Sequence, residues 1–269
     1  MVSTNGTVNA ERSWELAARA GYAVSGVLHV LIGVLALRVA FGNGGEKADQ
    51  SGALAAIAST PFGGLVLWFS VLAFLALGAW QVAKAIHGGS PTSGGKGESG
   101  AGDRAKAVGR AVVYLALAFA AFSFARGGGS SSSQQTADAT AKLMSAPGGR
   151  ILVGAVGLAI VVVGGYHVYK GWTKKFLEDL HRLPSGPAGP TVRRLGIAGY
   201  VLKGVALAIV GVLFVTAAAE ANPSKATGLD GALHTLRDQP AGVAMLVIVA
   251  LGFIAYGIYS FARARYGRI

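Results

Sequence analysis

Two ionisable side chains lie inside long apolar stretches of the sequence, where they are the best candidates for chemistry. His29 follows Gly21 by eight residues, which places it about 12 Å along a helix, and Lys203 interrupts the apolar stretch 195–219. An imidazole at that depth can bind a ligand, relay protons or ligate haem, since ionisable residues inside a membrane usually serve function. The alternative is a neutral His29 bonded to a neighbouring helix and a Lys203 that snorkels to the headgroups. The functional interpretation places Lys203, Ser25 and His29 in one polar pocket.

A haem held by two histidines would need a second imidazole at the depth of His29. His87 and His167 both lie near helix ends, several ångströms from that depth. No metal-binding spacing such as His-Glu-x-x-His occurs, and the chain has no cysteine for thiolate or disulfide chemistry. We therefore expect no cofactor and no metal, and we expect that the protein is not an enzyme.

Polar residues also recur near the end of the second helix of each repeated segment. Gln81, His167 and Ser260 each follow a repeated proline by 20 residues, so they could ring the cytoplasmic mouth of a central cavity. The alternative is that helix ends near headgroups are polar in any case. No Asp or Glu lies within the apolar stretches, which disfavours transport coupled to protons or sodium, because carboxylates commonly carry the coupling ion.

Six stretches meet or approach the length and apolarity needed to cross a membrane. Charged residues make up 13% of the chain, against about 25% in soluble domains. A spanning helix needs roughly 20 apolar residues, and the candidates are 21–41, 63–83, 111–125, 151–169, 195–219 and 241–262. They are apolar on all sides, unlike the alternating strands of a membrane barrel. The predicted fold is therefore all-α and polytopic, with six transmembrane helices.

The placement of Lys and Arg predicts the orientation of these helices. The two termini and the linkers after the second and fourth apolar stretches carry 16 of the 24 Lys and Arg residues, and the opposite loops carry 7. Because such an excess marks the cytoplasmic face, we expect both termini in the cytoplasm and the protein in the plasma membrane. This bias and attraction to anionic lipid explain the net charge of +12, so nucleic-acid binding is not expected.

The apolar stretches form three tandem copies of one helical hairpin. The first helices of the outer copies share Gly-Tyr-x-x-x-Gly, at 21–26 and 199–204, whereas the middle copy has Arg110 and Tyr114 in place of the Tyr and the second Gly. Each second helix begins with a proline, which a first helical turn tolerates; the three are Pro61, Pro147 and Pro240. Nine glycines are predicted to allow close helix packing, and these are Gly21, Gly26, Gly33, Gly78, Gly164, Gly199, Gly204, Gly211 and Gly257.

Each repeat contains two spans, so the three repeats are parallel to one another. We expect them to be related by a pseudo-threefold axis near the membrane normal. A short amphipathic helix before each proline is expected to lie on the outer face. Asp49, Asp138 and Asp230 are the predicted N-caps of these short helices.

The repeated Gly-Tyr-x-x-x-Gly and Pro-x-Gly sequences resemble a bacterial family known as domain of unknown function 1206. The resemblance covers residues 17–266. It implies three tandem two-helix units in a membrane, and it implies no established activity and no catalytic residue. The middle copy departs from the pattern at Arg110 and Tyr114.

The expected organisation is a cytoplasmic segment, three hairpin repeats and two cytoplasmic linkers. In chain order these are the segment 1–20, repeat 21–87, linker 88–106, repeat 107–176, linker 177–194 and repeat 195–266. The charged stretch 169–181 is expected to extend the fourth span into the cytoplasm, as a surface for a partner.

The lack of a recognisable catalytic constellation favours a non-enzymatic scaffold or accessory subunit. Its partners would be the lipid bilayer and another membrane protein. The first alternative is a channel or transporter that binds a small solute or a lipid, which His29 and Lys203 support. The second alternative is a haem or redox membrane protein, which only the isolated histidines support.

Overall fold

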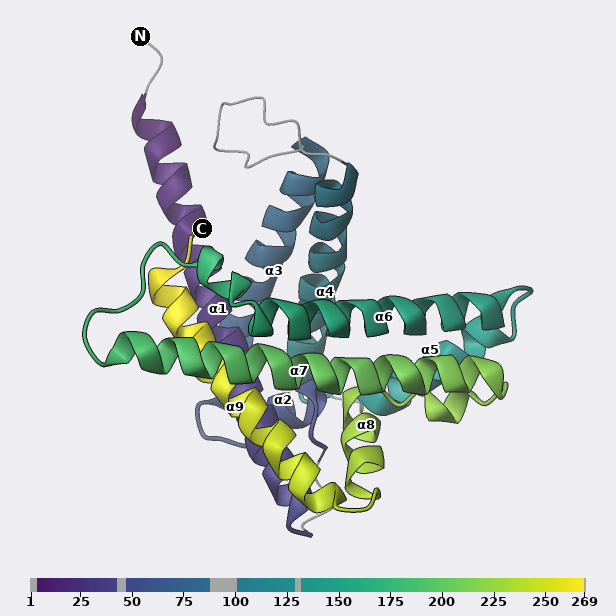
Figure 1. The fold of residues 1–269 in the computed structure, drawn as a ribbon. Helices are drawn as coiled ribbons and strands as arrows, with labels where there is room; N and C mark the ends of the chain where they lie inside the picture. Colours follow the sequence, from purple (N-terminus) through teal and green to yellow (C-terminus); the bar gives the residue numbers. More distant parts are fainter. Residues whose placement is uncertain (1–3, 43–46, 88–100, 129–131, 269) are drawn as a thin grey trace. The chain divides into compact units, whose positions relative to one another are not determined.

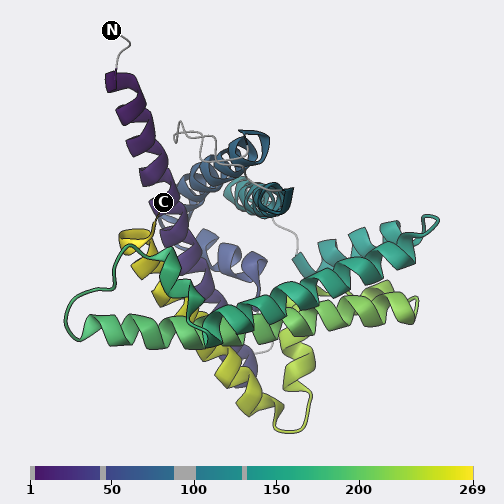
Figure 2. The same ribbon diagram turned by 45° about the horizontal axis from the view of Figure 1, so that its top comes forward.

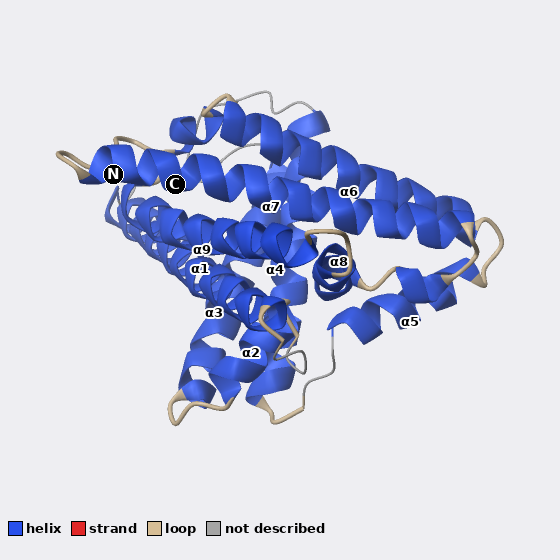
Figure 3. Cartoon of the chain, turned by 60° about the horizontal axis from the view of Figure 1, so that its bottom comes forward, coloured by secondary structure: helices blue, strands red, loops and turns tan. Residues whose placement is uncertain are grey.

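The computed structural model describes residues 4–42, 47–87, 101–128 and 132–268, and these residues are mainly helical (Figures 1 and 3). The helices are α1 (Thr4–Ala40), α2 (Gln50–Ala58), α3 (Gly63–His87), α4 (Ala101–Ala125), α5 (Ser132–Met144), α6 (Gly149–Trp172), η1 (Lys175–Asp179), α7 (Ala188–Ala219), η2 (Pro223–Lys225), α8 (Gly228–Arg237) and α9 (Gly242–Tyr266). Residues 88–100 of the predicted first linker lie outside the described ranges.

Among the described residues, six helices are long and apolar enough to cross a membrane. They are α1 from Ala18 onward, α3, α4, α6, α7 and α9. The described ranges contain no strand, only an isolated bridge between Leu180 and Gly267. The predicted all-α, multi-pass membrane fold is confirmed, whereas the pseudo-threefold axis and the outer-face position of the short helices stay predictions.

The chain divides into two compact units, each with its own internal packing. The first unit comprises residues 1–24 and 57–128, which hold the start of α1 together with α3 and α4. The second unit comprises residues 25–56 and 129–268, which hold the rest of α1 together with α6, α7, α9 and most of the short helices.

Within these units, the second span of each repeat packs along the first span of the following repeat. In the first unit α3 packs on α4, and in the second unit α6 packs on α7. The last span, α9, packs on α1, because Gly257 lies against the backbone of Gly26. Figures 1 and 2 both show α6 beside α7 and α9 beside α1.

The close approaches between these helices occur at glycines. A Cβ added to Gly164 would lie 2.7 Å from the carbonyl oxygen of Gly204, and a Cβ on Gly257 would lie 2.7 Å from that of Gly26. These two contacts join equivalent positions of the repeat. All nine glycines predicted to pack helices have an atom within 3.0 Å of an added Cβ. At Gly21 and Gly78 the nearest atoms belong to leucine side chains. At the other seven glycines they include backbone atoms, so side chains there would force the backbones apart.

The middle repeat lacks the contact between two glycine backbones, because a tyrosine replaces one of the glycines. Tyr114 occupies the position of Gly204, and its ring stacks on Phe74 with centroids 6.4 Å apart. Gly78, the equivalent of Gly164, therefore lies against the side chain of Leu115, 2.8 Å from an added Cβ.

The repeated Pro-x-Gly sequence forms a turn, so the prediction of a proline in the first helical turn is wrong. Pro61, Pro147 and Pro240 each lie two residues before their helix. In all three turns, the glycine N–H donates to the carbonyl of the residue before the proline, at 2.9, 2.9 and 2.7 Å. This is a β-turn with proline at its second position, where the fixed φ of proline is favoured. The turn reverses the chain between the short helix and the span.

The short helices begin differently from the sequence-based prediction. Asp49 caps α2 as predicted, because its carboxylate accepts the backbone N–H of Gly52 at 2.9 Å. Asp138 lies in the middle of α5, which begins at Ser132, and Asp230 lies in the first turn of α8 rather than at its cap. The predicted caps at Asp138 and Asp230 are therefore wrong. α2 carries polar side chains only at Gln50 and Ser51, so it is not amphipathic.

Candidate intramembrane polar site

The structure brings Ser25, His29 and Lys203 into direct contact within the second unit. Nδ1 of His29 lies 2.7 Å from the backbone carbonyl of Ser25, one turn earlier in α1. Because a carbonyl only accepts, this contact fixes the proton on Nδ1 and leaves Nε2 as an acceptor. Nζ of Lys203, near the middle of α7, lies 2.9 Å from that Nε2 and donates to it. The amine of Lys203 is thus directed to a side chain on another span.

Aromatic residues of α9 complete this polar site. Nζ of Lys203 lies 3.9 Å from the centroid of the Tyr256 ring. The His29 ring lies 4.7 Å from the ring of Tyr256 and 6.1 Å from that of Phe253. The face of the Tyr256 ring attracts a cation. The site therefore joins three helices, with His29 from α1, Lys203 from α7 and Tyr256 from α9. Sequence reasoning missed Tyr256 and Phe253, because an aromatic residue inside an apolar span shows no local sign of the residue that it contacts.

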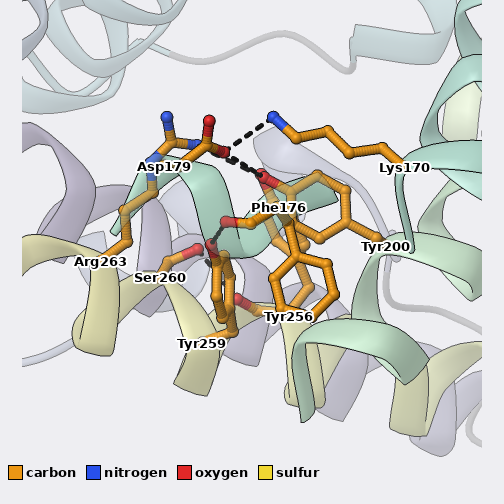
Figure 4. A network of polar contacts seen from close by, with 8 residues as sticks. All are labelled: Lys170, Phe176, Asp179, Tyr200, Tyr256, Tyr259, Ser260 and Arg263. Atoms are coloured by element: carbon orange, nitrogen blue, oxygen red, sulfur yellow. Dashed lines mark hydrogen bonds and ion pairs between the residues drawn. The ribbon is translucent and has the colours of Figure 1, made fainter. Parts of the chain in front are cut away.

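A second polar network surrounds Asp179, close to Tyr200 (Figure 4). Oδ2 of Asp179 is 2.7 Å from Nζ of Lys170 and 3.3 Å from a guanidinium nitrogen of Arg263. The hydroxyl of Tyr200 donates to the same oxygen at 3.5 Å and accepts from Arg263 at 3.3 Å. All three charged side chains are largely buried. The network joins the last turns of α6 and α9 to Tyr200 of α7.

The segment that carries Asp179 folds back instead of extending α6. Lys174 adopts a left-handed conformation with φ of 62°, and η1 then returns toward α9. Phe176 is fully buried against Tyr200 and Tyr259, and its carbonyl accepts the Tyr259 hydroxyl at 3.0 Å. The expectation that 169–181 projects into water is therefore wrong, since Phe176 is buried and Asp179 pairs with Lys170 and Arg263.

The three residues predicted to ring a cytoplasmic mouth are placed as follows. Gln81 is buried in the first unit. His167 and Ser260 belong to the second unit: Nδ1 of His167 bonds the Val163 carbonyl at 2.9 Å, and the Ser260 hydroxyl donates to the Tyr256 carbonyl at 2.8 Å. The His167 ring also stacks on Tyr200, 5.8 Å between centroids. The ring of three residues stays a prediction.

The sequence is similar to proteins of one family across nearly its whole length. The family described as Domain of Unknown Function (DUF1206) matches it three times, over residues 20–88, 105–174 and 198–267. The uncharacterized protein YxxB of Bacillus subtilis (strain 168) is 31% identical over 252 residues, which cover 92% of this chain and 89% of that protein. No solved structure matches significantly. These findings confirm the family resemblance and the three tandem repeats: the chain belongs to the DUF1206 family.

Proposed function

We propose that this protein is a non-enzymatic membrane protein that binds a small solute or a lipid at the polar site of Ser25, His29, Lys203 and Tyr256. The proposal is carried by one observation: a hydrogen-bonded lysine and histidine lie inside the spans, on different helices. A charged side chain at such a depth is energetically expensive and typically marks a ligand or ion pathway.

The other repeats indicate that packing alone does not require this site. At the position of His29 they carry Leu117 and Leu207, and at the position of Tyr256 they carry Leu77 and Val163. At these two positions the repeats are therefore built twice with apolar side chains. A polar site at the junction of the first and third repeats is then a specific addition to the framework.

The scaffold or accessory subunit, which the sequence alone favours, is the second candidate function, and the packing of the spans supports it. On α6 the buried residues are Gly149, Val153, Gly157, Gly164 and Gly171, so the helix is held by a narrow, largely glycine stripe. Such close-packed pairs form a rigid framework on which another membrane protein can assemble. The haem alternative is less favoured. Nε2 is the His29 atom that could ligate iron, and it accepts a hydrogen bond from Lys203 instead.

We also propose that both termini face the cytoplasm, in the plasma membrane. The excess of Lys and Arg in the termini and in the two linkers supports this orientation. The network of Lys170, Asp179 and Arg263 would then lie at the cytoplasmic ends of the spans, and the Lys203–His29 pair would lie deeper.

The test is native mass spectrometry of the protein extracted gently from its own membranes. His29→Leu and Lys203→Ser introduce residues that already occupy equivalent positions in another repeat, Leu207 and Ser25, so the framework should tolerate them. We expect the wild type to retain a bound species at fixed stoichiometry and both variants to lose it. Lys142→Ser, which removes an exposed charge on α5, should retain it.

Two results would contradict the proposal. If both variants retain the same species as the wild type, the polar site does not bind it. If only a protein subunit is retained, and the variants keep it, the scaffold function is favoured instead.

A further inference from the structure

We propose that the ligand of this site carries an anionic oxygen group, such as a phosphate or a carboxylate, which pairs with Lys203. This inference rests on the proposed function. It concerns the chemical class of the ligand, and it follows from the balance of charges around the site.

The polar site and the Asp179 network form one continuous cluster with an excess of positive charge. Tyr256 contacts Lys203 and lies 5.2 Å from Tyr200, ring to ring. Tyr200 in turn contacts Asp179 and Arg263, and Lys170 lies over its ring, 5.5 Å from the centroid. Among the described contacts, this cluster joins three cationic side chains to one carboxylate, and that carboxylate already binds Lys170 and Arg263.

No carboxylate of the described chain compensates Lys203. α7 and α9 contain no Asp or Glu, and those of α1 are confined to its first turns, at Glu11 and Glu15. An ionised amine in an apolar surrounding is strongly unfavourable unless an opposite charge accompanies it. An anionic ligand from outside the described chain would supply that charge.

The donor geometry of Lys203 agrees with this class of ligand. An ammonium group has three protons and no acceptor. One proton is directed to Nε2 of His29, and the charge lies over the face of Tyr256. An oxyanion would accept a charge-assisted hydrogen bond from a remaining proton. A cationic ligand would be repelled, and a neutral one would leave the charge uncompensated.

The anionic group can belong to a lipid headgroup or to a free solute, and a titration followed by native mass spectrometry separates the two. The probes are dioleoylphosphatidylglycerol, dioleoylglycerol as the same lipid without a phosphate, and inorganic phosphate. The variants are Lys203→Ser, Lys203→Arg, His29→Leu and the control Lys142→Ser. Thermal unfolding of each variant checks that it is folded.

We expect one anionic probe to bind at one-to-one stoichiometry, and Lys203→Ser to weaken that binding about tenfold or more, as for one lost charge-assisted hydrogen bond. Lys203→Arg and Lys142→Ser should retain it. Binding of phosphatidylglycerol identifies a lipid, and binding of phosphate alone identifies a solute. Equal binding of dioleoylglycerol that still depends on His29 and Lys203 would overturn this inference and leave the proposed function standing. Binding that no variant weakens would overturn both.

Discussion

The Gly164→Leu substitution is expected to separate α6 from α7 and to prevent stable folding of the second unit. An added Cβ would lie 2.7 Å from the backbone nitrogen of Ala208 and from the carbonyl oxygen of Gly204. Both are backbone atoms of a helix, which cannot rotate aside as a flexible side chain can. Because the two backbones must move apart along their length, we expect a destabilisation of more than about 3 kcal/mol.

The neighbouring glycine supplies a matched control for this prediction. Gly165 has no atom within 4 Å of an added Cβ, so Gly165→Leu adds the same side chain to the same helix without a collision. Thermal unfolding and size-exclusion chromatography in detergent should show aggregation or a large fall in Tm for Gly164→Leu only. An equal loss in both variants would mean that α6 tolerates no added bulk and that the contact with Gly204 is not the cause.

The Asp179→Ala substitution is expected to have the second large effect, because it removes the carboxylate that Lys170 and Arg263 both contact. Lys170 and Arg263 have side chains that are 15% and 20% exposed, so water cannot fully solvate them once the carboxylate is gone. Breaking a buried ion pair from one side costs about 3–5 kcal/mol, and partial exposure reduces the expected loss to about 2–4 kcal/mol. The segment η1 should detach from α9.

Glu178→Ala is the control for this second prediction, since it removes an adjacent acidic side chain that is exposed. Limited proteolysis reports the detachment of η1, because a released segment presents its backbone to the protease. We expect rapid cleavage near Lys174 and Lys175 in Asp179→Ala, and wild-type resistance in Glu178→Ala. Resistance of Asp179→Ala would show that burial of Phe176 alone holds the segment.

The spans and the repeat were predictable because their signals are local in the sequence. A run such as that of α9 has one structural solution in a bilayer, and Gly26 and Gly204 stand at the same offset in their repeats. Close helix contacts at those glycines follow from their size. The structure adds which helix each glycine meets: Gly26 meets Gly257, from the far end of the chain.

The remaining features depend on tertiary contacts that no local pattern contains. The sequence of residues 175–179 is typical of a charged helix extension. Four of the five neighbours of Phe176 between Lys174 and Asp179 are charged, so they do not indicate that Phe176 is buried. The turn at Pro240 depends on a left-handed Ala241 with φ of 61°, a conformation that propensity disfavours. The sequence alone favours a snorkelling Lys203. Only the structure places its amine beside Tyr256 and His29.

The most direct test of the polar site is solid-state NMR of the protein in lipid bilayers, with isotope-labelled lysine and histidine. The account predicts a through-space correlation between the Lys203 amine and the His29 imidazole, and its loss in His29→Leu. A Lys203 amine that correlates with lipid phosphorus and with no imidazole would contradict it. Lys203 would then be a snorkelling residue at the headgroups, and the site would not exist as described.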